Sequence, residues 1–315
     1  MSGFGFHTTS EEVCNKFSSE IKGKTFLITG CSPSGLGAEM ARTLALHSPG
    51  LLILAGRRLE ALHETAAEVK QSDPSVTVRL LKLDLASLAQ VREAAAEVLR
   101  YPEPIHCLIN NAGLSGIPYK LSEDGIELLF AINHVGHFLF TNLIMPRILT
   151  AGPGARVVNL SSVGHLGSPI RFDDINFKKG DYTWVKAYGQ SKTANILFSL
   201  SLADKLKDKE ITAFSLHPGA IRTNIWRHFT TDYMFKQGWV DEEGNSTEGV
   251  IHWKNMSEGA ATSLVAALDP ELSRHSGAYL DDCQICSAAP YAMDKDNAEK
   301  LWKLTEELVG QKFEY

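Results

Sequence analysis

Seven short apolar runs, separated by stretches with the periodicity of amphipathic helices, constrain the fold of this chain more than any other feature. Several runs are continuously apolar rather than alternating, as expected of strands that are covered by helices on both faces. The runs are Thr25–Thr29, Leu51–Ala55, Val76–Leu81, Ile105–Ile109, Ala155–Leu160, Ile211–Leu216 and Gly277–Leu280. This alternation of strands and helices predicts an α/β fold with a doubly wound parallel sheet of about seven strands.

The chain of 315 residues can form one large α/β domain, so we expect a single domain over 1–315. Residues 1–22 precede the first run as an N-terminal extension, in which Thr9-Ser-Glu-Glu12 has the capping-box pattern of a short helix. Two segments, Val163–Val185 and Asn224–Asn255, interrupt the alternation. Because long insertions at the ligand edge of a domain are often functional, we expect 224–255 to be a substrate lid.

Composition argues against several kinds of partner. A net charge of −6, with scattered Lys and Arg, argues against nucleic acid. No apolar run reaches the roughly 20 residues that span a bilayer, and the N-terminus lacks a signal-peptide layout. We therefore expect no membrane span and a cytoplasmic location. Five cysteines fit a reducing compartment, and the lone Cys283-Gln-Ile-Cys286 pattern favours free thiols over a metal site.

The segment Thr29–Gly37, TGCSPSGLG, follows the first run and has the composition of a phosphate-binding loop. Glycines at this place allow positive φ and let backbone N–H groups approach an anion at the start of the next helix. Gly30, Gly35 and Gly37 can do both, with Leu36 opening the helix between them. A glycine-rich turn by itself is a weak signal, and a merely structural turn is the alternative.

The end of the second run indicates which dinucleotide would bind. In such a fold this strand end faces the adenosine ribose, where a carboxylate selects a free 2′-hydroxyl and an arginine suits a 2′-phosphate. The run ends in Gly56-Arg57-Arg58 without Asp or Glu, so Arg57 predicts NADP(H); two solvated arginines are the alternative. After the third run, Asp84, followed by Leu85, could accept from the adenine amino group or cap the helix that begins near Ser87.

Tyr188 and Lys192 stand four residues apart on a long predicted helix, so their side chains lie on one face of it. The pKa of a free tyrosine is about 10, and a nearby ammonium lowers it by favouring the phenolate. Such a pair is a tunable general acid and base. Pairs of Tyr and Lys at this spacing also arise by chance on many helices, so the pattern alone is weak.

Taken together, these motifs make the chain similar to the short-chain dehydrogenases/reductases. The similarity covers roughly residues 22–282, and the joint occurrence of the motifs is specific although each one is not. They are Thr29–Gly37, Asp84, Asn110-Asn-Ala-Gly113, Asn133, Ser161-Ser162, Tyr188 with Lys192, and His217-Pro-Gly219 with Thr223. VVNLSSVGH and GAYLDDCQ resemble the retinol-dehydrogenase-like and WW-domain-oxidoreductase-like branch.

The resemblance implies an oxidoreductase that interconverts a carbonyl and an alcohol, and Arg57 makes NADP(H) the predicted cofactor. Tyr188 would exchange a proton with the substrate oxygen, and Lys192 would lower the tyrosine pKa and hold the nicotinamide ribose. Ser162 would hydrogen-bond the substrate oxygen where negative charge develops. Asn133 would fix a water that relays protons to Lys192. Ser161 could replace Ser162 in this role, since alternation along a strand turns one of them away, and Asn133 could instead be a satisfied buried amide.

The remaining cofactor contacts follow from the same resemblance. Asn111, Ala112 and Gly113 would form part of the cofactor wall and stabilise a strand end. Pro218, Gly219 and Thr223 would lie near the nicotinamide or a phosphate, although Thr223 could be a simple turn residue.

The glycine-rich loop departs from the family's commonest spacing by one extra residue. It also contains Pro33, which has no N–H to offer a phosphate. We therefore predict that the hydroxyl of Ser32 or Ser34 supplies a replacement donor.

The segment 224–255 is rich in aromatic side chains, which could cover a lipophilic ketone, aldehyde or alcohol. Anchoring of the segment on the core is the alternative. The side chains are Trp226, Phe229, Tyr233, Met234, Phe235, Trp239 and Trp253, with His165 and Trp184 as further candidates for the rim.

Two other functions stay open at this point. An NAD-dependent alcohol dehydrogenase is opposed by the missing acidic residue after the second run, and a non-catalytic dinucleotide-sensing regulator is opposed by the presence of Asn133, Ser162, Tyr188 and Lys192. The family often dimerises through helices corresponding to those that begin near Ser122 and Tyr182, so a homodimer is one option.

Overall fold

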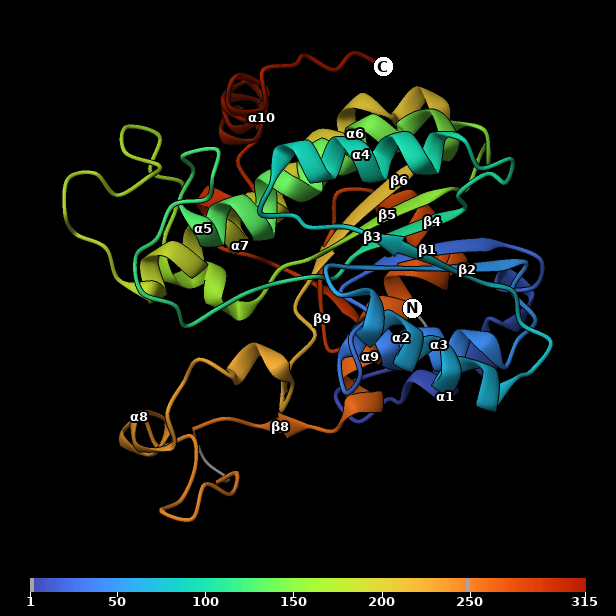
Figure 1. Cartoon of the computed structure of the whole chain (residues 1–315), viewed down its shortest axis with the longest axis horizontal. Helices are drawn as coiled ribbons and strands as arrows, with labels where there is room; N and C mark the ends of the chain where they lie inside the picture. Colours follow the sequence, from blue (N-terminus) through green and yellow to red (C-terminus); the bar gives the residue numbers. More distant parts are fainter. Residues whose placement is uncertain (1–2, 248–249) are drawn as a thin grey trace.

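The computed structural model describes residues 3–247 and 250–315, and an eight-stranded sheet lies at its centre (Figure 1). The strand order is β10-β9-β6-β5-β4-β1-β2-β3, with β10 antiparallel to β9 and the other strands parallel. The strands are β1 Thr25–Thr29, β2 Leu51–Gly56, β3 Val78–Lys82, β4 Cys107–Asn110, β5 Arg156–Leu160, β6 Thr212–Leu216, β9 Tyr279–Asp281 and β10 Gln284–Cys286. The predicted fold class is confirmed, and β10 is an addition to the seven predicted strands.

Helices cover both faces of the sheet, which explains the continuously apolar strands (Figure 1). On one face lie α4 Leu88–Leu99, α6 Gly136–Leu149, α7 Trp184–Lys205 and α10 Lys295–Val309; on the other lie α1 Ser10–Lys16, α2 Leu36–Ala45, α3 Leu59–Ser72 and α9 Met256–Leu268. All five residues of β1 are buried. The predicted capping box of the first helix is confirmed, since Thr9 and Glu12 cap α1 reciprocally.

The order of the parallel strands reverses between β1 and β4, which places a crevice at their carboxyl ends. The loops that follow β1, β2, β4, β5 and β6 meet at this edge of the sheet. The topology therefore brings together residues that are far apart in the sequence.

The helix expected to start at Ser122 begins later, so this boundary was wrong. Gly125 has a φ of 75°, and the turn around it delays the helix until α5, Leu128–Phe130. The buried carboxylate of Glu127 caps α5 by accepting from the backbone N–H groups of Leu129 at 3.1 Å and Phe130 at 2.8 Å. A π-helical turn, Ala131–Val135, then leads into α6.

Within the described residues, one helical stretch, Leu128–Leu149, is long and apolar enough to cross a membrane by length and composition. In this fold 83 % of its most apolar part is buried inside the protein. The same test is passed by core helices, and this stretch packs on the sheet as one of them.

The C-terminal helix α10 packs on α7, and the tail that follows it reaches α6. The Trp302 ring lies 4.8 Å from that of Phe138 on α6 and 6.0 Å from that of Phe198 on α7, measured between ring centroids. The Tyr315 hydroxyl donates to the side chain of Asn142. The chain's own C-terminus therefore covers part of the surface of α6 and α7.

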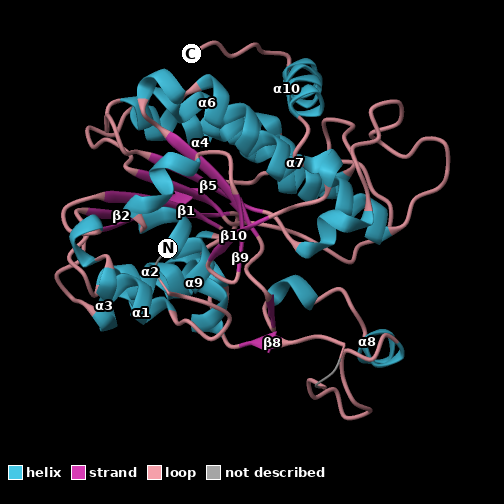
Figure 2. Cartoon of the chain, turned by 180° about the vertical axis from the view of Figure 1, so that it is seen from behind, coloured by secondary structure: helices cyan, strands magenta, loops and turns pink. Residues whose placement is uncertain are grey.

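Segment 224–255 projects from the sheet-and-helix body with α8, Thr231–Lys236, and β8, Trp253–Lys254 (Figure 2). β8 pairs with the short β7, Ala220–Ile221, directly after the carboxyl end of β6. The segment therefore starts and ends near the edge at which the strand ends meet.

Candidate active site

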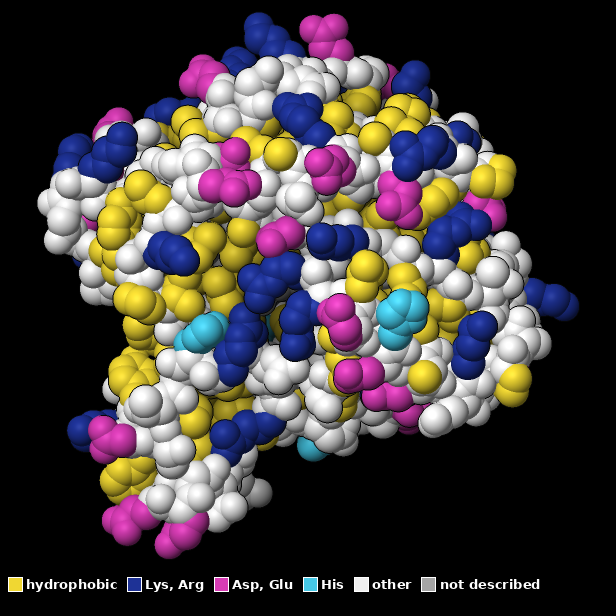
Figure 3. All heavy atoms as spheres, viewed as in Figure 1, with side chains coloured by type: hydrophobic (Ala, Val, Ile, Leu, Met, Phe, Trp, Pro, Cys, Tyr) yellow, Lys and Arg dark blue, Asp and Glu magenta, His cyan; other side chains and the backbone are white. Residues whose placement is uncertain are grey.

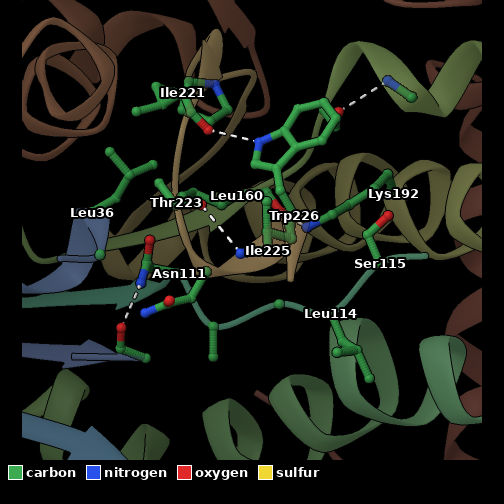
Figure 4. A pocket seen from close by; sticks show the side chains of 18 of the residues that line it. Leu36, Asn111, Leu114, Ser115, Leu160, Lys192, Ile221, Thr223, Ile225 and Trp226 are labelled. Carbon is green, nitrogen blue, oxygen red and sulfur yellow. Dashed lines mark hydrogen bonds between the residues drawn. The ribbon is translucent and has the colours of Figure 1, made fainter. Parts of the chain in front are cut away.

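A cavity of ≈ 1010 Å³ opens at the carboxyl ends of the parallel strands. Most of the residues predicted for the site line it, and Figure 4 shows Lys192 and Ser115 on one side and Leu36 and Asn111 on the other. The predicted residues in the lining are Gly30, Ser32, Gly35, Leu36, Arg57, Asp84, Leu85, Asn111, Ala112, Gly113, Ser162, Tyr188, Lys192, Pro218, Gly219 and Thr223. Three others, Ser34, Gly37 and Asn133, lie next to this lining rather than in it.

Neighbouring backbone atoms come so close to Gly30 and Gly37 of the glycine-rich loop that side chains would not fit there. Gly30 has a φ of 76°, and a Cβ there would stand 2.7 Å from Cα of Ala112. A Cβ on Gly37 would stand 2.7 Å from the carbonyl oxygen of Gly30, so Gly37 lets α2 pack against the loop. Gly35 is the N-cap of α2 and offers no side-chain cap. The positive end of α2 therefore faces the cavity and can attract a phosphate.

The extra residue of this loop changes which serine can act as a donor. Ser34 is exposed and has a φ of 57°, whereas Ser32 is half-buried and lines the cavity. The structure thus favours Ser32 over Ser34 as the replacement donor. The carbonyl oxygen of Pro33 accepts from Nδ2 of Asn224 at 3.2 Å.

The loop after β4 ties two strand ends together and also forms a wall of the cavity. Nδ2 of Asn111 donates to the carbonyl oxygen of Thr29 at 2.7 Å, and the backbone N–H groups of Asn111 and Ala112 donate to Oγ1 of Thr29 at 3.0 Å each. Both parts of the prediction for this loop are therefore consistent with its geometry. At the next strand end, Ser87 caps α4, while Asp84 accepts from the N–H of Ala86 at 3.0 Å and lines the cavity.

Tyr188 and Lys192 lie on α7, with Nζ of Lys192 5.6 Å from the centroid of the tyrosine ring. The Nζ donates to the carbonyl oxygen of Leu160 at 2.9 Å, which fixes it at the end of β5. A Cβ on Gly164 would stand 2.7 Å from the Tyr188 ring, so the glycine makes room for the tyrosine.

The two serines after β5 have different surroundings. The hydroxyl of Ser161 donates to the backbone carbonyl oxygen of Lys192 at 2.7 Å and is buried, although the residue borders the cavity. Oγ of Ser162 accepts from the N–H of Gly164 at 3.0 Å and is also hydrogen-bonded to Tyr188. Of the two alternatives, the geometry favours Ser162 as the serine that meets a ligand beside Tyr188.

The acid–base properties of the pair differ from the expectation. Burial raises the pKa of Tyr188 to about 12, only partly opposed by the hydrogen bond with Ser162. Burial also lowers the pKa of Lys192 to about 8. Lys192 therefore does not lower the tyrosine pKa as predicted, because its Nζ donates to Leu160 and burial dominates the shift. At neutral pH the phenol keeps its proton and can donate it.

Asn133 is fully buried in the π-helical turn. Its Oδ1 accepts from the N–H of Leu114 at 2.8 Å, and its Nδ2 donates to the carbonyl oxygen of Leu114 and to Oγ of Ser191, both at 2.9 Å. Both amide hydrogens are therefore used within the protein. The bonds fit the buried-amide alternative, in which Asn133 holds the loop behind Gly113. The role of Asn133 in fixing a water stays a prediction.

Of the side chains named in segment 224–255, three line the cavity, whereas Tyr233, Met234, Phe235 and Trp253 do not. Trp226, Phe229 and Trp239 line the cavity and also pack on one another, with ring centroids 5.3–6.0 Å apart. The indole N–H of Trp226 donates to the carbonyl oxygen of Ile221 at 2.7 Å (Figure 4). Trp184, on α7, also lines the cavity, and its ring centroid lies 4.9 Å from that of Phe229.

His165 was wrongly expected at the rim. It is buried, with Nδ1 2.7 Å from the carbonyl oxygen of Ser162 and Nε2 accepting from the N–H of Ala289 at 3.0 Å. Conversely, the sequence analysis missed Phe6 and Arg227, which line the cavity. They come from the N-terminal extension and from segment 224–255, where no strand-end position marks a residue as part of the site.

Comparisons with known proteins agree with this geometry. Residues 24–234 match the family model described as short chain dehydrogenase. The chain is 38% identical to short-chain dehydrogenase TIC 32 B, chloroplastic, of Brassica napus, over 98% of this chain and 95% of that protein. It is 36% identical to human retinol dehydrogenase 13, over 92% of this chain and 86% of that protein. The crystal structure of an uncharacterized protein from Mycobacterium Paratuberculosis superposes with a TM-score of 0.72, at 29% identity, over 95% of this chain and 98% of that one.

The chain therefore belongs to the short-chain dehydrogenase family and resembles its retinol dehydrogenases. It is an oxidoreductase of the class that acts on CH–OH and C=O groups with a nicotinamide dinucleotide. The cavity fits such a cofactor, because its glycine-rich loop leaves no room for side chains and the uncapped start of α2 faces it.

Proposed function

We propose that this protein is an NADP(H)-dependent oxidoreductase that interconverts a lipophilic ketone or aldehyde and the corresponding alcohol, with Tyr188 as general acid and base. One observation carries the proposal: Ser162, Tyr188 and Lys192 open into the same cavity as Arg57 at the end of β2. The residues proposed for proton transfer and the arginine proposed to select the cofactor thus line the same cavity. The expected cytoplasmic location stays a prediction.

The residues of the cavity suit the parts of a dinucleotide. The loop from Gly30 to Leu36 would hold the pyrophosphate, Asp84 the adenine and Arg57 the 2′-phosphate. The cofactor, when bound, supplies or accepts a hydride. Lys192 and Thr223 line the part of the cavity nearest Tyr188 and segment 224–255, where they would hold the nicotinamide end.

The protein's own groups would manage the proton and the developing charge. Tyr188 holds its proton at neutral pH, so in the reducing direction it can pass that proton to the carbonyl oxygen. Ser162 would donate a hydrogen bond to the same oxygen, where negative charge develops. Lys192 stays cationic below about pH 8 and adds favourable charge beside both groups.

The cavity walls near Tyr188 support a lipophilic substrate. Trp184, Trp226 and Phe229 line the cavity there and present apolar ring surface. Several relatives are named as retinol dehydrogenases, and retinol is a lipophilic alcohol. Both points support a lipophilic carbonyl or alcohol rather than a sugar.

Titration of the purified protein with NADPH and NADH, followed by cofactor fluorescence, tests the proposal first. We expect NADPH to bind about 10- to 100-fold more tightly, since a hydrogen bond to a charged group contributes about 1.5–3 kcal/mol. Arg57→Ala should remove most of this preference and leave NADH binding unchanged. A preference for NADH would favour an NAD-dependent enzyme instead. Binding of NADPH without turnover of any aldehyde or ketone, retinal included, would favour a dinucleotide-sensing regulator.

The two serines after β5 offer a matched pair of variants. Ser162→Ala should lower kcat by about 10²- to 10³-fold, the usual cost of one donor to a developing oxyanion. Ser161→Ala should keep most of the activity and lower the free energy of unfolding by about 1 kcal/mol, because it removes one buried hydrogen bond. Steady-state kinetics and urea denaturation of both variants separate these effects. The reverse pattern would assign the substrate oxygen to Ser161.

A further inference from the structure

Three arginines gather at one end of the cavity. Arg57 and Arg58 come from the connection between β2 and α3, and Arg227 comes from segment 224–255, just after the turn Asn224–Trp226. All three line the cavity and are exposed to solvent. Figure 3 shows basic side chains gathered at the centre of this face, where the projecting segment meets the body.

These guanidinium groups carry uncompensated positive charge. Within residues 3–247 and 250–315, no carboxylate forms an ion pair with Arg57, Arg58 or Arg227. Burial, together with the neighbouring charges of Arg57 and Arg58, lowers the pKa of Arg227. Like charges at close range raise the free energy of the protein unless an anion lies between them.

The start of α3 adds to this positive potential. Arg58 is its N-cap residue, and no side chain caps the first turn. A helix of 14 residues with an uncapped N-terminus presents N–H groups and a positive dipole end. The arginines and the helix end thus favour an anion at the same place.

Asn224 links Arg227 to the glycine-rich loop. Its Nη1 donates to the carbonyl oxygen of Asn224 at 2.7 Å, and the side chain of Asn224 donates to Pro33 in the glycine-rich loop at 3.2 Å. The first turn of segment 224–255 is therefore hydrogen-bonded to the glycine-rich loop. The adjacent Trp226 belongs to the aromatic wall of the cavity.

We propose that Arg227 is a further ligand of the cofactor's 2′-phosphate, supplied by segment 224–255, so that this phosphate fastens the segment over the substrate end of the cavity. The proposal rests on the proposed function and extends it. A 2′-phosphate between Arg227 and Arg57 would link the segment to the body through charge-assisted hydrogen bonds. A cofactor with a free 2′-hydroxyl cannot make this link. NADP(H) would then both bind more tightly and order the lid.

The test compares the affinities of three probes, NADPH, NADH and 2′,5′-ADP, for the wild type, Arg227→Ala and Arg227→Lys. We expect Arg227→Ala to weaken NADPH and 2′,5′-ADP by about 10-fold and NADH by less than twofold. The lysine variant, which keeps the charge, should recover part of the loss. Lys236→Ala is the matched control, because Lys236 lies in the same segment and pairs with Asp232 on α8.

Chymotryptic cleavage within 224–255 supplies a second readout that does not depend on activity. NADPH and 2′,5′-ADP should slow cleavage of the wild type and of Lys236→Ala, whereas NADH should not, and Arg227→Ala should lose this protection. If the wild type prefers NADPH and Arg227→Ala keeps both the preference and the protection, this inference fails while the proposed function stands. If the wild type shows no preference for NADPH, the proposed function fails first.

Discussion

Replacing Tyr188 with phenylalanine should lower kcat by about 10²- to 10⁴-fold, the range that a positioned general acid contributes. The variant loses one hydroxyl and keeps the ring, which packs closely against Gly164. Cofactor affinity should change little, because Arg57 and the glycine-rich loop are untouched. Single-turnover reduction of an aldehyde, together with NADPH titration of the same variant, measures both quantities. Loss of turnover with retained binding is the expected result.

Tyr182→Phe is a suitable control for this experiment. Tyr182 lies just before α7. Its hydroxyl donates to the carbonyl oxygen of Ile117 at 2.8 Å. Its loss should cost about 1 kcal/mol of stability and leave kcat near the wild-type value. Appreciable turnover by Tyr188→Phe, within tenfold of Tyr182→Phe, would mean that another group transfers the proton. In that case the role given to the high pKa of Tyr188 would be wrong.

The sheet could be predicted because its strands are covered on both faces and therefore read as continuous apolar runs. The bounds of β1, Thr25–Thr29, were predicted without error. β10 was missed because it has three residues and follows a turn in which Asp282 and Cys283 both have positive φ. The prediction that a helix starts at Ser122 was wrong. The helix starts at α5, which is capped by the buried carboxylate of Glu127, and only the tertiary structure fixes the position of that carboxylate.

The site could be predicted where it consists of strand ends, because parallel strands bring their carboxyl ends to one edge. Sequence spacing places Tyr188 and Lys192 on one helix face, but it cannot tell that the Nζ of Lys192 is directed at Leu160. Nor can it tell that both hydrogens of the Asn133 amide are used by the protein. The sequence did not mark Arg227 as a site residue. Arg227 lies in an irregular segment, where no helical or strand periodicity predicts which way a side chain points.

Replacing Trp302 with alanine should lower the free energy of unfolding by about 3–5 kcal/mol, a large part of the stability of an ordinary domain. Trp302 is 3% exposed and packs between Phe138 and Phe198. Its indole N–H donates to Glu306 at 2.9 Å, so the ring also stiffens α10. Urea denaturation followed by circular dichroism measures the loss. Lys303→Ala, next to it but 68% exposed in its side chain, should change stability by less than about 0.5 kcal/mol.

The same variant tests whether α10 covers a surface of α6 and α7 on which a second copy of the chain would otherwise pack. The aromatic face of α6 and α7 around Phe138 and Phe198 would be open to a partner if α10 did not cover it. We therefore expect light scattering to give the monomer mass of 34.6 kDa for the wild type. Trp302→Ala should loosen α10 and produce concentration-dependent association, because exposed apolar patches favour contact between copies. A wild-type dimer whose mass is unchanged in Trp302→Ala would place the interface on another face of the molecule.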